Sequence, residues 1–308
     1  MNKQICDEIT FRKLEIFLAY MATGNLAKAA EQLDISPVSV HRALHSLEDG
    51  VGCSLFHHAG RNLIPTEAAR MLASTASEVL GRMANGIQAT REAAGLYADK
   101  LRIGSVYSLT AQLVPRIVVD LKARRPKLST ELVLGSNTDL TEKLRQGHID
   151  AALMPIFSPD PEFESIKLFE DSIYFAAPAG SRYAGRKTIG LDEVRDELFV
   201  SLSGGFATSR GFQEAFQRAG FSPHIAMEVS DIFTLMNLVK GGLGYSLLPG
   251  RVRNLFGEHI QFIPLDDRFQ IHQAIGLSFL RARERDPNLL ALAAACRMIG
   301  KNESGYLI

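Results

Sequence analysis

The chain has 308 residues, of which 46% are hydrophobic and 22% are charged. This composition is typical of a globular protein with sizeable cores, and it excludes a disordered chain or a small disulfide-stapled scaffold. The 34 basic residues equal the 34 acidic residues in number, so bulk charge gives no argument for nucleic-acid binding. At roughly 100–200 residues per domain, the length predicts two or three folded units.

The cysteines and the lengths of the apolar stretches indicate the cellular compartment of the protein. Cys6, Cys53 and Cys296 are widely spaced and form no CxxC pair or Cys/His cluster. This pattern argues against a structural zinc site and favours a reducing compartment. The first residues do not fit a secretory signal, and no apolar stretch approaches the roughly 18 residues that span a bilayer. We therefore expect a cytoplasmic protein with no membrane partner.

The first 66 residues predict three short helices and a hairpin. A first helix ends at Gly24, and Asn25 is a good N-cap for a second. Ser36 and Pro37 fit the N-cap and first position of a third helix, which is apolar on one face and polar, partly cationic, on the other. Two short helices joined by a tight turn predict a helix-turn-helix, and the Gly-Arg-Asn turn at 60–62 predicts a wing.

Charge leaves a second interpretation open for this segment. Residues 1–66 hold six Lys/Arg against seven Asp/Glu, and helix pairs of this kind also occur in proteins that never touch DNA. If the segment binds DNA, the affinity must come from where its charges lie, from helix N-termini and from dimerisation.

Residues 67–97 predict one long helix, because they lack proline and keep apolar residues at helical spacing. Such a helix carries an apolar stripe that can pair with a second copy of the chain. Packing of the stripe against its own domain is an equally good interpretation of the pattern.

The remaining sequence alternates between strands and helices. Strands are predicted at 101–106, 130–135 and 151–156, with helices between them, which indicates an α/β unit with a largely parallel sheet. A second series begins with a strand at 172–178. The chain is expected to leave and rejoin the first α/β unit near 171–173 and 266–272. Two crossings between two lobes create a cleft, which is a usual location for a small ligand.

In this order, the motifs resemble those of LysR-type transcriptional regulators. Within the first 66 residues the matching positions are Leu14, Phe17, Ala29, Ala30, Leu33, Ser36, Val40, Leu44, Leu47, Glu48, Gly52, Leu55, Phe56, Arg61 and Thr66. The phrases GHIDA at 147–151 and GLGYSLLP at 242–249 are typical of the two-lobed domain of this family. The resemblance spans essentially the whole chain.

The resemblance implies a fold class and a division into domains. The fold class is α/β with an N-terminal all-α winged helix-turn-helix, a long linker helix and a two-lobed effector domain like that of periplasmic binding proteins. The expected domains are a DNA-binding domain at 1–66, a linker and dimerisation helix at 67–97, and an effector-binding domain at 98–308. Within the last, lobe I is expected at 98–171 and 272–300, and lobe II at 172–271.

Some positions depart from the usual family pattern. These are Pro37, His41, His58, Pro65 and Ala69, and they bear on the preferred DNA sequence rather than on the fold. The stretch from Ser36 to Pro65, which reads SPVSVHRALHSLEDG…CSLF…GRNLIP, is also similar to regulators of malonate-decarboxylase operons.

For DNA, the resemblance implies that Arg42 reads a base, because an arginine fork can bond guanine in two places. A solvated surface arginine is the alternative that position alone would favour. The other expected DNA-binding residues are Ser36, Pro37, Val38, Ser39, His41 and Arg61. For these, helix packing, N-capping or a plain turn are competing interpretations.

The expected effector-binding residues follow strands, at the sheet edge where α/β proteins bind ligands. They are Ser108, Ser136 and Asn137 in one lobe and Ser201, Ser203, Gly204, Phe206 and Asp231 in the other. Hydroxyl groups and helix N-terminal amides suit a small carboxylate, and malonate is the suspected effector. A helix N-cap without a ligand is the alternative for each serine alone.

No catalytic constellation is found. Lys187 comes one place too late for a phosphate-binding loop that begins at Gly180, and no GxSxG, HExxH or GxGxxG context is present. We therefore expect no enzyme activity, no metal and no cofactor. The expected function is a DNA-binding transcriptional regulator that senses a small organic acid. The alternative is a solute-binding or enzymatic α/β protein with a helical appendage.

The expected partners follow from that function. They are a double-stranded DNA operator, the organic acid, RNA polymerase if the protein is an activator, and further copies of the chain in a homodimer or homotetramer.

Overall fold

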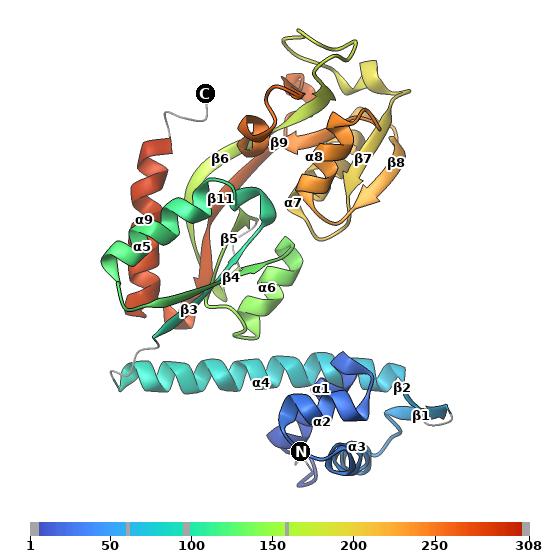
Figure 1. The fold of residues 1–308 in the computed structure, drawn as a ribbon, viewed down its shortest axis with the longest axis vertical. Helices are drawn as coiled ribbons and strands as arrows, with labels where there is room; N and C mark the ends of the chain where they lie inside the picture. The colour runs from blue at the N-terminus through green and yellow to red at the C-terminus, as the bar shows by residue number, and fades with distance from the viewer. Residues whose placement is uncertain (1–5, 60–61, 95–98, 158–159, 304–308) are drawn as a thin grey trace. The chain divides into compact units, whose positions relative to one another are not determined.

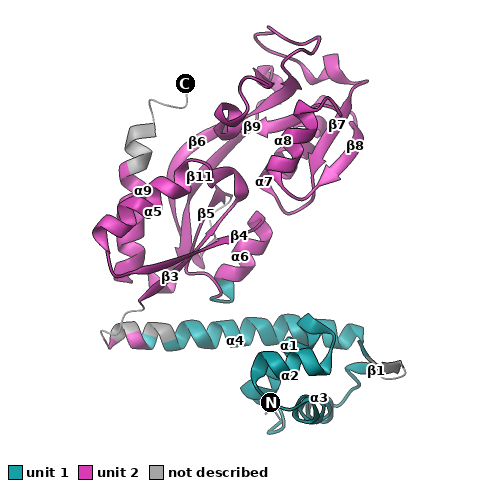
Figure 2. Ribbon diagram, in the orientation of Figure 1, with its two compact units in different colours: residues 1–90, 145–147 teal, residues 91–144, 148–308 magenta. Residues whose placement is uncertain are grey.

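The computed structural model in Figure 1 describes residues 6–59, 62–94, 99–157 and 160–303. These residues form two compact units, coloured separately in Figure 2. The first contains residues 1–90 and 145–147, and the second contains residues 91–144 and 148–308. Each unit has its own hydrophobic core.

The first unit consists of helices and one hairpin. Its elements are α1 (Phe11–Thr23), α2 (Leu26–Leu33), α3 (Pro37–Val51), β1 (Phe56–Ala59), β2 (Asn62–Pro65) and most of α4 (Glu67–Ala93). Strands β1 and β2 pair antiparallel, with His57 opposite Ile64. The predicted winged helix-turn-helix and the predicted long helix after it are both present.

Polar side chains begin the three short helices. Thr10, Asn25 and Ser36 accept hydrogen bonds from backbone amides in the first turns of α1, α2 and α3. Gly24 and Gly52 end α1 and α3 at φ values of 61° and 77°, a backbone conformation that glycine adopts without steric cost. The helix boundaries predicted at Gly24, Asn25 and Ser36 are therefore confirmed.

The second unit consists of two α/β lobes. In lobe I the strand order is β6-β11-β5-β3-β4, with β3 parallel to both β4 and β5. Strand β11 is antiparallel to both β5 and β6, so the predicted largely parallel sheet was wrong for this half of the lobe. The strands are β3 (Lys100–Ser105), β4 (Ser129–Leu134), β5 (Ala151–Ile156), β6 (Phe163–Pro178) and β11 (His272–Leu280). The helices are α5 (Leu113–Arg124), α6 (Asn137–Arg145) and α9 (Pro287–Glu303). Helices α5 and α9 lie side by side and bury Ile117, Leu121, Leu289 and Leu292 in the core (Figure 1).

Lobe II is built around one parallel pair of strands and around the second half of β6, which lies between two further strands. Strands β7 (Leu198–Leu202) and β8 (His224–Val229) are parallel. Strands β9 (Ser246–Pro249) and β10 (Ile260–Pro264) each pair antiparallel with the second half of β6. Helices α7 (Ala207–Ala219) and α8 (Ile232–Lys240) complete the lobe, and a short 3-10 helix, η3 (Gly250–Leu255), follows β9.

The chain crosses between the lobes twice. Strand β6 pairs with β11 up to Ser172 and with β9 and β10 from Ile173 onward, so it belongs to both lobes. The return crossing lies beside it, where the Ile173 N–H donates to the Ile271 carbonyl at 3.0 Å. Both crossings were predicted, but the predicted start of β6 at residue 172 was wrong. The first half of this 16-residue strand is half exposed and carries Lys167 and Glu170 among apolar residues, so it lacks the buried run of the second half.

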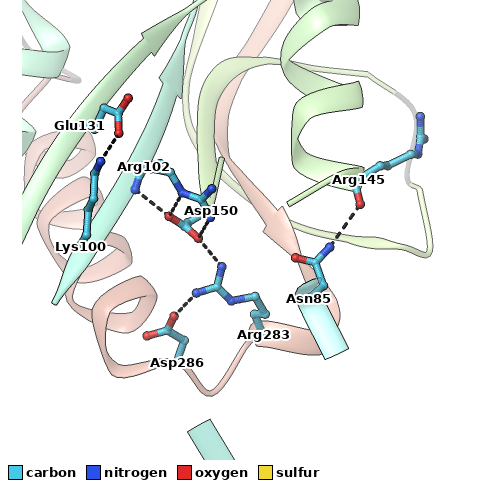
Figure 3. Close-up of polar contacts among 8 residues, drawn as sticks. All are labelled: Asn85, Lys100, Arg102, Glu131, Arg145, Asp150, Arg283 and Asp286. Carbon is cyan, nitrogen blue, oxygen red and sulfur yellow. Dashed lines mark hydrogen bonds and ion pairs between the residues drawn. The ribbon is translucent and has the colours of Figure 1, made fainter. Parts of the chain in front are cut away.

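A buried ion-pair network holds the base of lobe I (Figure 3). Asp150 accepts from the backbone N–H of Arg102 at 2.7 Å, from its guanidinium at 3.1 and 3.2 Å, and from Arg283 Nη1 at 2.6 Å. Arg283 Nη2 donates in turn to Asp286. Burial raises the pKa of Asp150, but the hydrogen bonds from Arg102 and the charge of Arg283 outweigh it and hold that pKa below its ordinary value. Asp150 belongs to the GHIDA phrase, which therefore has a structural role.

Candidate DNA-binding and effector-binding sites

The outer face of α3 is polar at its start. The Ser36 hydroxyl accepts from the Ser39 N–H at 3.1 Å, and the two hydroxyl oxygens lie 2.8 Å apart. Pro37 occupies the first helical position, and Val38 is 67% exposed. Ser36, Pro37, Val38 and Ser39 are thus all exposed on the first turn. An exposed helix start with amides and hydroxyls is a favourable place for a phosphate.

Arg42 lies on the next turn of α3 and is exposed. It forms no hydrogen bond or ion pair with any residue that the structure describes. Its neighbour His41 is half-buried, and its Nε2 lies 3.3 Å from Nε2 of His45. The Nδ1 of His45 lies 3.1 Å from Glu48 Oε2. Arg42 is therefore the cation of this face that remains available to an outside partner, whereas His41 already has a neighbour.

Near the start of the first unit, Glu8 and Glu15 are paired with nearby cations. Glu8 lies 2.6 Å from Lys13 Nζ, and hydrogen bonds from Lys13 and Ser46 lower its pKa. Glu15 lies 3.0 Å from a guanidinium nitrogen of Arg12. Glu8 and Glu15 therefore add little net negative charge to this segment, whereas the exposed Asp34 lies two residues before the start of α3 at Ser36.

The hairpin is fixed to the helices by two side chains. Glu48 Oε1 accepts from the backbone amides of Leu55 and Phe56, and the Tyr20 hydroxyl donates to the Leu63 carbonyl at 2.9 Å. Arg61, expected at the tip of the wing, lies outside the described residues.

Between the lobes of the second unit lies a small cavity of about 10 Å³, roughly the space of one water molecule. Its lining residues come from both lobes and are Val106, Tyr107, Ser108, Asn137, Leu202, Phe206, Ala207, Thr208, Ile232 and Arg251. Of the eight expected effector-binding residues, three line it: Ser108, Asn137 and Phe206. The predicted interlobe cleft is therefore present, and it is nearly closed.

Direct hydrogen bonds bridge the lobes at this cavity. Asn137 Oδ1 accepts from the Ala207 N–H at 2.9 Å, and Asn137 Nδ2 donates to the Pro155 carbonyl at 3.3 Å. The Thr138 N–H donates to the Gly205 carbonyl at 3.3 Å. The start of α6 in lobe I is thus joined to the start of α7 in lobe II, and a ligand of more than one or two heavy atoms needs these starts to separate.

Arg251 reaches across the cavity from lobe II. Its Nε donates to the Ser108 hydroxyl of lobe I at 2.8 Å. Its Nη1 donates to Asp171 Oδ2 at 2.8 Å and to Gln273 Oε1 at 3.0 Å. The Arg251 and Asp171 side chains are each 5% exposed. Burial lowers the pKa of Arg251, and the charge of Asp171 and its hydrogen bond act in the opposite direction.

The other five expected effector-binding residues do not line the cavity. Ser136 begins α6, where its hydroxyl accepts from the Asp139 N–H at 3.2 Å. Asp231 begins α8. Burial raises the pKa of Asp231, but hydrogen bonds from Thr234 and Phe233 lower it by more, so the net shift is downward. Ser201 lines a separate lobe II pocket of about 630 Å³ beside α7. Ser203 and Gly204 lie in the loop before α7, and Gly204 is exposed.

Seven of the ten lining residues were not among those expected from the sequence, and Thr208 and Arg251 are two of them. Arg251 stands two residues after the GLGYSLLP phrase, so a cation directly after a buried strand was a readable signal. Its contact with Ser108, 143 residues away, was not readable, because no local pattern specifies it.

No group of three or more His, Cys, Asp or Glu placed to hold a metal occurs within the described ranges. Among the helices of that same part of the chain, none is long and apolar enough to cross a membrane.

A winged helix-turn-helix joined to a two-lobed α/β domain defines a DNA-binding regulator with a ligand-sensing domain. Residues 11–70 match the family described as bacterial regulatory helix-turn-helix protein, lysR family, and residues 94–299 match the LysR substrate binding domain. The chain belongs to the LysR family of transcriptional regulators. It is not an enzyme, and the alternative of a solute-binding or enzymatic protein with a helical appendage is set aside.

Relatives and solved structures agree with this assignment. The chain is 45% identical to the malonate utilization transcriptional regulator of Klebsiella pneumoniae, over 98% of this chain and 99% of that protein. It is 29% identical to the Hca operon transcriptional activator HcaR of Escherichia coli, over 82% of this chain and 86% of that protein.

The fold is shared with solved full-length structures. A CbnR complex with its target DNA superposes with a TM-score of 0.64 at 22% identity, covering 95% of this chain and 100% of that chain. A full-length OxyR variant from Pseudomonas aeruginosa has a TM-score of 0.64 at 20% identity, covering 94% of this chain and 95% of that chain. These likenesses confirm the predicted order of a winged helix-turn-helix, a long helix and a two-lobed domain.

Proposed function

We propose that this regulator controls genes for the use of malonate or a closely related small dicarboxylic acid, and that the acid binds between the two lobes. The observation that carries the proposal is the interlobe cavity, where hydroxyl, amide and guanidinium groups from both lobes converge with the start of α7. Such donors suit a small anion. The similarity to a regulator of malonate utilization supports this choice of acid.

On the DNA side, we propose that the start of α3 enters the major groove. Arg42 bonds a guanine through its fork, and Ser36, Pro37, Val38 and Ser39 lie against the backbone and neighbouring bases. His41 and the wing residue Arg61 complete the contact. The exposure of Arg42 and the absence of any described partner for it support this role.

Two copies of the chain are proposed to act together on an inverted repeat. Helix α4 carries four large apolar side chains that are exposed in the single chain, and they are Met71, Val79, Met83 and Ile87. Their spacing of eight, four and four residues places them along one stripe of the helix. Pairing of this stripe with its equivalent in a second copy gives a homodimer, and two such dimers give a homotetramer.

The acid is proposed to act by changing the closure of the lobes and thereby the arrangement of the DNA-binding heads. Linkage requires that DNA changes the affinity for the acid by the same factor. The complex then recruits or excludes RNA polymerase in the cytoplasm.

A fluorescence anisotropy titration tests the proposal. Full-length protein is titrated onto the duplex upstream of its own gene and onto a scrambled duplex, across a salt series, with and without malonate. We expect tighter binding to the upstream duplex, a steep loss with salt and a shift with malonate. Equal binding to both duplexes at every malonate concentration contradicts the proposal.

A further inference from the structure

We propose that Arg251 binds the carboxylate of the effector and sets the preference of the cleft for a dicarboxylic acid. This inference rests on the proposed function, because it requires that an organic acid enters the interlobe cleft. It assigns a binding role to a residue outside the set that the sequence analysis selected.

The inner side of the guanidinium is fixed by the two interlobe crossings. Asp171, on β6, accepts from Arg251 Nη1 and also from the Arg251 backbone N–H, at 2.8 and 3.2 Å. Gln273, on β11, accepts from the same Nη1 at 3.0 Å. Asp171 and Gln273 are themselves buried, at 6% and 7% exposure. The guanidinium is therefore held in one orientation at the place where both strands pass from lobe to lobe.

The outer side of the guanidinium faces the cavity and keeps donors available. An arginine side chain has five N–H donors, and Nε and Nη2 form one edge that can bond both oxygens of a carboxylate. Nε donates to Ser108, whereas Nη2 has no hydrogen-bond acceptor among the residues that the structure describes. Because the Ser108 oxygen accepts from Arg251, its own hydroxyl hydrogen is available to a ligand. The two residues together thus offer N–H and O–H donors to a single carboxylate.

The surroundings favour an anion of small size. Arg251 and Asp171 neutralise each other, and no carboxylate lies among the described lining residues to oppose a bound anion. The start of α7 lines the same cavity at Ala207 and Thr208, and a helix start favours a second negative group. The Arg251 guanidinium and the start of α7 lie on either side of a small space. They therefore fit a short dicarboxylic acid better than a long or singly charged one.

The same contacts tie binding to lobe closure. The Arg251–Ser108 bond and the Asn137–Ala207 bond both join lobe I to lobe II. An acid that accepts from Arg251 and Ser108 must sit where the cavity now has space for one water molecule. Its entry therefore changes the separation of the lobes.

Calorimetric titration of the full-length protein tests this inference. The ligands are malonate, its monoamide malonamate, and propionate. The variants are Arg251→Lys and the pair Arg251→Met with Asp171→Asn, which leaves no carboxylate buried without its partner. Arg218→Met is the matched control, because Arg218 is also in lobe II, donates to the Gln270 carbonyl near the second crossing and lies outside the cavity.

We expect malonate to bind the original chain and the Arg218→Met variant with equal affinity, and malonamate and propionate to bind at least tenfold more weakly. Arg251→Lys is expected to weaken malonate binding at least tenfold and to narrow the preference for malonate over propionate, while the circular dichroism spectrum stays that of a folded protein. The double variant is expected to lose malonate binding while its circular dichroism spectrum stays folded.

Two negative outcomes are distinguishable. A folded double variant that binds malonate as tightly as the original chain overturns the role of Arg251 and leaves the proposed function in place. An original chain that binds none of the three acids overturns the proposed effector and the role of Arg251 together.

Discussion

Glu48 and Leu55 are joined by a hydrogen bond of 2.8 Å from the Leu55 N–H to Glu48 Oε1, and the same oxygen accepts from the Phe56 N–H at 3.0 Å. The carboxylate near the end of α3 therefore satisfies the first two amides of the hairpin. This contact fixes the wing to α3, which is the helix expected to enter the major groove.

The first prediction concerns this joint. Glu48→Ala leaves two half-buried amides without their acceptor, so we expect the free energy of unfolding of the first unit to fall by about 1–3 kcal/mol. Glu48→Gln keeps a side-chain oxygen as acceptor, so we expect a smaller loss in the free energy of unfolding. Urea denaturation followed by circular dichroism measures both. Glu31→Ala, an exposed change on α2, is the control. An unchanged midpoint for Glu48→Ala contradicts the structural role.

The second prediction concerns base recognition. Arg42→Ala is expected to weaken binding to the upstream duplex by about 1–3 kcal/mol, because the fork to guanine is lost. Arg42→Lys keeps a charge for phosphate but not the fork, so it is expected to lose discrimination against the scrambled duplex more than overall affinity. Anisotropy measures both effects.

Arg124→Ala serves as the control for Arg42, since Arg124 is an exposed arginine of α5 paired with Asp120. Malonate affinity should stay the same in all three variants. A parallel loss of DNA binding and malonate binding in Arg42→Ala would indicate misfolding and remove the assigned role.

What the sequence predicts well is local. The starts of α2 and α3 follow from Asn25 and Ser36, because an N-cap is decided by a side chain and an amide two or three residues away. The same local rule explains Ser136 and Asp231, which were expected in the effector site but begin α6 and α8. From the sequence alone, a serine or an aspartate that caps a helix cannot be distinguished from one that binds a ligand.

What the sequence does not predict is set by long-range packing. The family resemblance placed Ser108 and Asn137 beside the cavity, but only the folded chain brings Arg251 to Ser108. Strand β6 was predicted in part, since its first half is half exposed. The α/β order and both lobe crossings were predictable, because they follow from the alternation of buried strands and amphipathic helices.

The third prediction separates the two serines of lobe I. Ser108→Ala removes a hydroxyl that lines the cavity and is expected to lower malonate affinity about three- to tenfold, equivalent to the loss of one hydrogen bond of about 1 kcal/mol. Ser136→Ala removes a cap of α6 and is expected to lower stability by about 1 kcal/mol with little effect on malonate. Calorimetry and thermal melting measure the two quantities. Equal losses of affinity would contradict this separation.

The fourth prediction concerns pH. The folded pKa of Asp150 lies below its ordinary value of 3.8, so ionised Asp150 stabilises the second unit above that pH. The contribution is lost as the pH falls through the folded pKa. Asp150→Asn leaves Arg102 and Arg283 without their carboxylate and is expected to cost about 3–5 kcal/mol near neutral pH. Urea denaturation midpoints from about pH 3 to about pH 7 measure this dependence, because this range includes the ordinary carboxyl pKa of about 4.

The control for Asp150 is Asp120→Asn, which breaks an exposed ion pair of α5 and is expected to change stability by less than about 1 kcal/mol. If the Asp150→Asn variant kept the stability and the acid dependence of the original chain, the network in Figure 3 would have no stabilising role.

The last prediction explains a glycine of the GLGYSLLP phrase. A Cβ added at Gly244 would lie 2.6 Å from the Leu198 carbonyl oxygen and 3.0 Å from its carbon, both backbone atoms that cannot rotate away. The next residue donates its N–H to the same carbonyl at 2.8 Å, so the close approach joins the segment before β9 to β7. Gly244→Ala is therefore expected to destabilise lobe II by about 1–3 kcal/mol. Gly180→Ala meets no atom within 4 Å and should leave the melting temperature unchanged. Equal melting temperatures for the two alanine variants would show that the backbone of β7 can shift to make room for the Cβ. The close packing at Gly244 would then not contribute to stability.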